Sequence, residues 1–114
     1  MTSPQPTATI RQSDIEKLRV QYRINDIPLA VRTERNVEAG GFADASRNPN
    51  TWTAYLFVDG QWAQIESARG LRREWTSLDR LERWLRSMGF RAFAVRNDVE
   101  PAGPQAGSAG VSMK

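Results

Sequence analysis

The chain contains no histidine and no cysteine, so the side chains available for chemistry are carboxylates, hydroxyls and guanidinium groups. The absence of histidine removes the commonest general base, the commonest zinc ligand and every Ser-His-Asp or Cys-His arrangement. The absence of cysteine excludes disulfides, thiolate nucleophiles and cysteine-type zinc sites. The composition therefore predicts a binding protein that is not an enzyme and has no metal and no cofactor.

Acidic pairs are the remaining candidates for catalysis. The closest are Glu74 with Asp79 and Asp79 with Glu82. Asp79 and Glu82 fall in or near the first turn of a predicted helix, where acids interact favourably with the helix dipole. No phosphate-binding loop, dinucleotide fingerprint, zinc-protease helix or nucleophile elbow occurs in the sequence. We assign no catalytic residue.

Arginine dominates the basic residues, with 14 among the 16 lysines and arginines, and the net charge is +3. Guanidinium groups form bidentate contacts with phosphate and carboxylate and stack on aromatic rings. A GC-rich genome would also favour arginine over lysine. Arginine usage is therefore compatible with a binding role without establishing one.

The strongest local pattern is a β-hairpin. The β-rich runs 52–58 and 61–67 flank Asp59-Gly60, a pair typical of a two-residue type I′ turn. This register places Phe57 opposite Trp62. One face then carries Trp52, Ala54, Leu56, Val58, Ala63 and Ile65. The other carries Thr53, Tyr55, Phe57, Trp62, Gln64 and Glu66.

The face with three aromatic rings is the first candidate binding surface. Its predicted members are Tyr55, Phe57, Trp62, Arg19, Arg23 and Arg32. Rings flanked by guanidinium groups are how open sheets hold single-stranded nucleic acid. The same rings could serve a protein interface, or be covered by the 34–50 loop, by an N-terminal helix or by a second subunit. A homodimer therefore remains open.

A basic region from residue 69 to 91 is the second candidate. It holds seven arginines and three acids. The candidate contact residues are Arg69, Arg72, Arg73, Arg80 and Arg83. Arg83 can pair with Asp79 at i, i+4 spacing, so an ordinary solvated helix face is the alternative interpretation.

The elements that position these residues indicate an α+β fold. We expect a short helix opened by a Ser13–Glu16 capping box, which passes into a strand near residue 19 or 20. Strands over 27–33, 52–58, 61–67 and 90–95 follow, with a helix from Thr76 or Ser77 to about Met88 before the last one. The apolar stripe of this helix contains Leu78, Leu81, Trp84, Leu85 and Met88. The prediction is an antiparallel sheet of about five strands with one main amphipathic helix on one face.

Three segments are expected along the chain. Residues 1–12 are predicted to be a disordered N-terminal arm, 13–97 a single α+β domain, and 98–114 a disordered tail rich in Pro, Gly, Ala and Ser. No apolar run is long enough to cross a membrane, and the N-terminus lacks the pattern of a signal peptide. We therefore expect a cytoplasmic protein.

Three stretches carry a resemblance to a known family. They read LRVQYRINDIPLAVRTE (18–34), YLFVDGQWAQIESARG (55–70) and WTSLDRLERWLRSMG (75–89). Together they resemble small plasmid-encoded ParC-type partition-associated proteins, which are distinct from the topoisomerase subunit of the same name. The resemblance implies an accessory of a bacterial mobile element that helps plasmid maintenance beside a partition ATPase and a centromere-binding protein. It carries over no functional residue.

Three functional hypotheses follow. The first is a plasmid partition or maintenance accessory that contacts a protein partner. The second is a small nucleic-acid-binding regulator that uses the aromatic and arginine face. The third is a mobile-element inhibitor of a host defence or transfer system.

Overall fold

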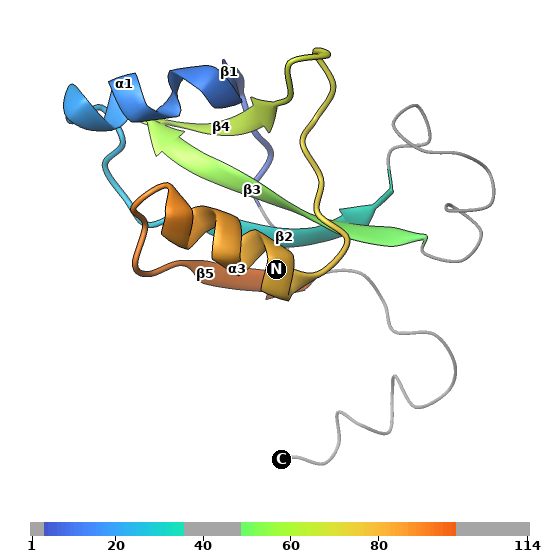
Figure 1. Cartoon of the computed structure of the whole chain (residues 1–114). Coiled ribbons are helices and arrows are strands. Elements are labelled where there is room, and N and C mark those ends of the chain that lie inside the picture. The colour runs from blue at the N-terminus through green and yellow to red at the C-terminus, as the bar shows by residue number, and fades with distance from the viewer. Residues whose placement is uncertain (1–3, 36–48, 98–114) are drawn as a thin grey trace.

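The computed structural model describes residues 4–35 and 49–97, which form a five-stranded sheet and two helices. The strands are β1 (Ala8–Arg11), β2 (Leu29–Glu34), β3 (Asn50–Val58), β4 (Gln61–Glu66) and β5 (Ala94–Asn97). The helices are α1 (Ile15–Val20), preceded by a 3-10 turn η1 (Gln12–Asp14), and α3 (Leu78–Ser87). The fold is therefore α+β, as predicted (Figure 1).

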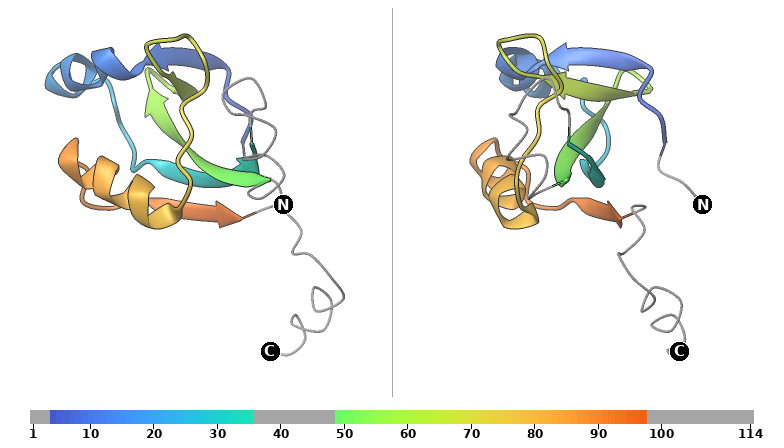
Figure 2. Two further views of the ribbon diagram at one scale, coloured as in Figure 1. Left: turned by 45° about the vertical axis from the view of Figure 1, so that its right-hand side comes forward. Right: turned by 90° about the vertical axis from the view of Figure 1, so that its right-hand side faces the viewer.

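The sheet is mixed, which corrects the expectation of a purely antiparallel one. Its strand order is β1-β4-β3-β2-β5. The three central strands are antiparallel neighbours, whereas β1 pairs parallel to β4 and β5 pairs parallel to β2. Parallel strands need a long crossover connection, and in each of these pairs the connecting chain includes a helix and two other strands. Figure 2 shows β1 and β4 at one end of a curved sheet, β2 and β5 at the other, and both helices on the same side.

The central hairpin forms as the sequence predicts. Asp59 and Gly60 have φ values of 52° and 82°, as a type I′ turn requires. Phe57 pairs with Trp62, Leu56 with Ala63 and Tyr55 with Gln64. This register directs the side chains of Leu56, Ala63 and Ile65 into the core.

The main core lies between one face of the sheet and the two helices. Ile15 and Leu18 of α1 and Leu81 and Leu85 of α3 are buried against the inner face of the sheet. Ser77 caps α3 by accepting a hydrogen bond from the Arg80 N–H at 3.1 Å. Gly89, at φ 97°, follows the helix in the left-handed conformation. The amphipathic stripe of α3 is thus confirmed as a core-facing one.

The N-terminal region differs from the prediction in two ways. Residues 8–11 of the expected disordered arm form β1, because Ala8 and Ile10 turn inward and pack against the core while Thr9 and Arg11 stay exposed. No capping box opens α1, since Asp14 precedes it without a side-chain cap and residues 12–14 form the 3-10 turn. The N-terminal strand was missed because its four residues lie in a stretch of low hydrophobicity.

The strand expected over residues 20–24 does not form. Helix α1 continues to Val20, and only an isolated bridge joins Ile24 to Val58. The alternation of Val20, Tyr22 and Ile24 also fits the end of a helix followed by a turn, and the tertiary contacts of Ile15 and Leu18 favour the helix. Strand β2 begins at Leu29 and β5 at Ala94, later than the sequence indicates. The predicted 98–114 tail and most of the 34–50 loop lie outside the described residues.

Candidate functional site

The predicted aromatic face is only partly a surface. Tyr55 is buried at 7% exposure beside Leu29 and Val31 of β2. Phe57 and Trp62 are half-buried and pack on each other edge to face, with ring centroids 5.1 Å apart. The three rings therefore share one face of the sheet, as predicted, but they do not form an exposed stacking platform.

The ionisation of Tyr55 reflects its position. Burial raises the pKa of the Tyr55 phenol, and the positive charge of Arg72 opposes that rise in pKa. Arg72 belongs to the connector between β4 and α3, so that connector approaches the same face of the sheet. Tyr55 acts as a packing residue here and is neutral at physiological pH.

The three arginines predicted to flank these rings lie elsewhere. Arg19 sits near the end of α1, with its Cζ 5.5 Å from the centroid of the Phe90 ring. Arg23 forms an ion pair with Asp59 at 2.5 Å, at the tip of the central hairpin. Arg32 pairs with Trp52, which places it on the helix-facing side. The prediction failed because the strand expected after residue 20 does not form. It also failed because β2 places Leu29, and not Arg32, on the face of the sheet that carries Tyr55.

Most of the second basic region is engaged within the chain. Arg72 pairs with Glu74 at 2.5 Å and donates to the Glu34 carbonyl at 3.0 Å. Arg73 stacks over Trp75 at 4.7 Å and donates to the Gln12 side chain, and burial lowers its pKa. Arg69 is exposed in the connector.

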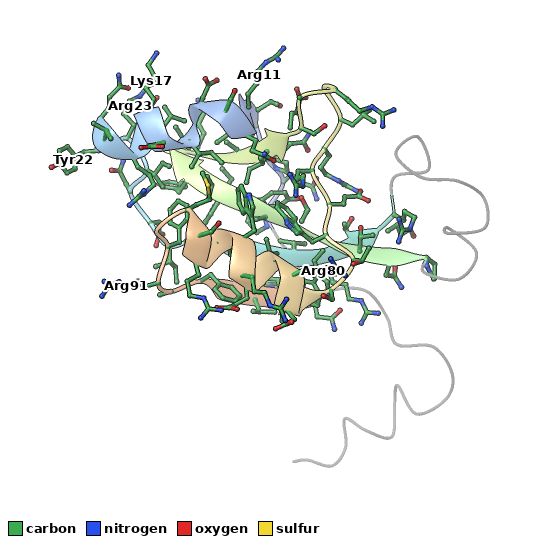
Figure 3. The ribbon with its side chains drawn as sticks, viewed as in Figure 1. Arg11, Lys17, Tyr22, Arg23, Arg80 and Arg91 are labelled. Carbon is green, nitrogen blue, oxygen red and sulfur yellow. The ribbon has the colours of Figure 1, made fainter. Side chains whose placement is uncertain are left out.

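On helix α3 the two predicted contact arginines, Arg80 and Arg83, differ in their ion pairing. Arg83 pairs with Asp79 at 2.7 Å across one helical turn, and both side chains are well exposed. Arg80 is exposed on the same helix (Figure 3). Arg86 pairs with Glu82 at 3.2 Å. Most arginines on the exposed face of the helix are therefore paired with carboxylates, which is typical of an ordinary solvated helix face.

Exposed apolar side chains gather at a place that the sequence did not indicate. Among residues 4–35 and 49–97, the exposed large apolar side chains are Val20 (69%), Tyr22 (87%), Ile27 (45%) and Val95 (46%). Three of these four lie between residues 20 and 27, in the segment that joins α1 to β2. Figure 3 shows Tyr22 projecting at the end of the molecule where Lys17, Arg23 and Arg91 also lie.

The backbone holds Tyr22 in that position. The helix end is a Schellman motif: the Tyr22 N–H donates to the Arg19 carbonyl and the Arg23 N–H donates to the Leu18 carbonyl, both at 3.0 Å. The residue at the turning point needs a positive φ, and Tyr22 has φ 57°. Glycine usually occupies this place because a side chain there is strained. The chain thus keeps an exposed ring at a position where glycine would relieve the backbone strain.

A groove adjoins the projecting ring. It has a volume of about 460 Å³ and runs between the 19–28 and 89–92 segments. Ile24, Ile27 and Phe90 supply apolar walls, and Arg19 and Arg91 supply positive charge. We call Val20, Tyr22, Ile27 and this groove the Tyr22 surface. The signal that could have revealed it is a helix end without glycine at its turning point.

Comparisons with known proteins place no further constraint on the site. No family model, no curated protein and no solved structure matches the chain. Within the described ranges, no group of three or more acidic residues is arranged to hold a metal ion. None of the helices there is long and apolar enough to cross a membrane.

Proposed function

We propose that this chain is a non-enzymatic binding protein whose Tyr22 surface contacts a protein partner. The observation that carries the proposal is Tyr22 itself, which is 87% exposed and held at φ 57°. A strained backbone persists where the surrounding structure enforces it, and such positions cluster at functional sites. An exposed aromatic anchor is also typical of the residues that dominate protein–protein binding energy.

The composition of the surface indicates the chemistry of the partner. Lys17, Arg19 and Arg91 are the cationic side chains of this region that form no ion pair in the described residues, and Asp26 is the carboxylate lining the groove. Arg23 is neutralised by Asp59. A partner segment with an apolar side chain beside carboxylates complements this arrangement. Such a segment would place its apolar group in the groove and its acids near Arg19 and Arg91.

The resemblance of residues 18–34, 55–70 and 75–89 to ParC-type partition-associated proteins supplies a setting for the proposal. In that setting the chain is an accessory of plasmid partition or maintenance, and its partner is a partition protein. The exposed residues Val20, Tyr22 and Ile27 fall inside the first of the three resembling stretches, whereas the 89–92 wall of the groove lies outside that stretch. The setting is a separate proposal, and the surface can be tested without it.

The decisive experiment compares wild type with Tyr22→Gly in partner binding. The full chain is used to capture proteins from a plasmid-bearing bacterial host, and the affinity of each purified candidate is then measured by calorimetry. We expect Tyr22→Gly to weaken binding by at least about tenfold, as for a hot-spot aromatic. Glycine suits the left-handed turn, so the loss will not come from unfolding.

Val95→Ser provides the matched control. Val95 is also a large apolar side chain with substantial exposure, at 46%, but it lies on β5 and not in the 20–27 segment. This variant should bind as tightly as wild type. A partner that binds Tyr22→Gly with unchanged affinity would disprove the assignment of this surface.

A further inference from the structure

The three arginines around the groove of the Tyr22 surface are held in different ways. Arg23 is paired with the carboxylate of Asp59 at 2.5 Å, so its charge is already balanced. Arg91 is exposed and projects away from the fold (Figure 3), and its side chain makes no hydrogen bond or ion pair within residues 4–35 and 49–97. Arg19 combines two properties that the others do not share, because it is both held in place and unpaired.

The segment that follows α3 restrains the Arg19 guanidinium. Its Cζ lies 5.5 Å from the centroid of the Phe90 ring, and it packs so closely on Gly89 that an added Cβ would lie 2.6 Å from Nη2. Neither contact uses an N–H donor of the guanidinium, and Arg19 has no ion pair in the described part of the chain. The donors are therefore available to a ligand. Because the side chain is already restrained, less of its entropy is lost on binding than for a guanidinium without such contacts.

The surroundings of Arg19 indicate the chemistry of its ligand. Ile24, Ile27 and Phe90 line the same groove of about 460 Å³, so an apolar group fits beside the guanidinium. Asp26 is the carboxylate among the lining residues, and its Oδ1 already accepts the Ile27 N–H at 2.7 Å. A planar guanidinium binds a carboxylate through two parallel hydrogen bonds. The groove is therefore complementary to a carboxylate that is joined to an apolar group.

The charge and the shape of the groove narrow this class further. One restrained guanidinium balances the single charge of a carboxylate, whereas the second charge of a phosphate monoester would be repelled by Asp26. The groove runs between the 19–28 and 89–92 segments, and Tyr22 is one of its lining residues. A partner segment that continues on both sides of an acidic residue can place one apolar side chain in the groove and another against the Tyr22 ring.

We propose that Arg19 is the specificity-determining residue of the Tyr22 surface and binds the side-chain carboxylate of an acidic residue in the partner. The apolar neighbour of that residue occupies the groove. Gly89 and Phe90 are positioning residues, because they hold the guanidinium where it can receive the carboxylate. This inference rests on the proposed function, since it assigns the partner's chemistry at the same surface.

The test compares two capped peptides, acetyl-Leu-Glu-Leu-amide and acetyl-Leu-Gln-Leu-amide, in amide NMR titrations of the full chain. Wild type should bind the Glu peptide at least about fivefold more tightly than the Gln peptide. Arg19→Gln should abolish this preference, and Arg19→Lys should retain only a small part of it, because an ammonium lacks the planar fork. Arg91→Gln is the matched control: it removes a charge from the same groove and should leave the preference unchanged.

Phe90→Leu tests the positioning role. Leucine keeps an apolar wall but removes the ring beneath the guanidinium, so the preference for the Glu peptide should fall while the affinity for the Gln peptide stays the same. A purely structural role of Phe90 would instead lower both affinities together. The melting temperature of Arg19→Gln should remain within a few degrees of wild type, because Arg19 is exposed.

Several results would overturn the inference. They are a preference that survives in Arg19→Gln, a preference that is lost in Arg91→Gln, and failure of wild type to bind the Glu peptide. A third peptide, acetyl-Leu-Gln-Leu with a free C-terminal carboxylate, distinguishes the source of the carboxylate. If it binds as tightly as the Glu peptide, the ligand is a chain end and the assignment to an acidic side chain is wrong.

The failure of this inference can be told apart from failure of the proposed function. A captured partner protein that is weakened by Tyr22→Gly but unaffected by Arg19→Gln supports the Tyr22 surface and overturns only the role of Arg19. Conversely, binding of the Glu peptide that depends on Arg19, without any protein whose binding depends on Tyr22, supports the carboxylate site and overturns the proposed protein contact.

Discussion

The guanidinium of Arg19 lies over the ring of Phe90, 5.5 Å from its centroid, and thereby joins the end of α1 to the segment that follows α3. This contact depends on Gly89. A Cβ atom added at Gly89 would lie 2.6 Å from Nη2 of Arg19. A cation–π contact therefore joins the two segments that wall the groove, and a side chain at position 89 would force the Arg19 guanidinium to move from its present place.

Replacing Gly89 by alanine should destabilise the protein for two reasons. Alanine is strained at φ 97°, which costs about 1–2 kcal/mol, and its Cβ would displace Arg19. Urea unfolding gives the free energy. The control is Gly70→Ala, because Gly70 also has a positive φ, 82°, but nothing lies within 4 Å of its added Cβ. In an Arg19→Ala background the two glycine substitutions should cost the same, and a persistent difference would contradict the role of Arg19.

Replacing Tyr22 by glycine should stabilise the fold. Removal of the strained side chain favours the folded state by up to about 1 kcal/mol after the greater entropy of unfolded glycine is included, equivalent to roughly 4–8 °C in a domain of this size. Thermal unfolding followed by circular dichroism measures the change. Tyr22→Ala is the comparison: it removes the ring but keeps the strain, so it should melt close to wild type. A Tyr22→Gly protein that melts well below wild type would mean that the ring packs within the chain.

Truncation of Leu81 to alanine should be strongly destabilising. Leu81 is fully buried between α3 and the sheet, so the loss of its side chain leaves a cavity that costs about 2–5 kcal/mol. Chemical denaturation is the measurement. Arg83→Ala on the same helix serves as the control, because both members of its ion pair with Asp79 are 68% exposed and the change should stay within about 0.5 kcal/mol. A small loss at Leu81 would show that α3 does not pack as described.

Because Arg23 and Asp59 form an ion pair, we expect the stability of the fold to depend on pH. The hydrogen bond from Arg23 lowers the pKa of Asp59, so the pair stabilises the fold above the ordinary carboxyl pKa of about 4, and this contribution is lost as the pH falls through the lowered pKa. Asp59→Asn preserves the turn, since Asn-Gly also forms type I′ turns, but removes the charge. The melting temperatures of wild type and Asp59→Asn, measured from pH 6 down to pH 2, should differ most at pH 6 and converge at the lowest pH. A difference in melting temperature that stays constant over this pH range would mean that Asp59→Asn destabilises the turn and that the ion pair contributes nothing.

The sequence predicts the parts of the fold that depend on local rules. The Asp59-Gly60 turn determines its own register, and the Ser77 cap, the Leu81 stripe and Gly89 are all readable from spacing. A strand near β5 was predicted, but β1 and the parallel pairing of both edge strands were not, because these pairs join strands far apart in the sequence. The side of the sheet that Arg32 occupies depends on the pairing of β2 with β3, which no local rule specifies.

The candidate site was harder to predict for the same reason. Sequence alternation correctly placed Tyr55, Phe57 and Trp62 on one face. It could not show that Leu29 and Val31 cover Tyr55, since that follows from the tertiary register. The exposure of Tyr22 depends on where α1 ends, and the same residues fit a strand equally well. The pairing of Arg72 and Arg73 with Glu74 and Gln12 likewise requires the path of the connector.

The parallel pairing of β2 with β5 has a consequence for synthesis on the ribosome. Strands β2, β3 and β4 can assemble as they emerge, but one edge of β2 stays open until Ala94–Asn97 has been made. An unpaired strand edge is a template for association with other chains. Once β5 has paired, the hydrogen-bonding groups along that edge of β2 are satisfied within the chain, so β2 can no longer pair with another copy there.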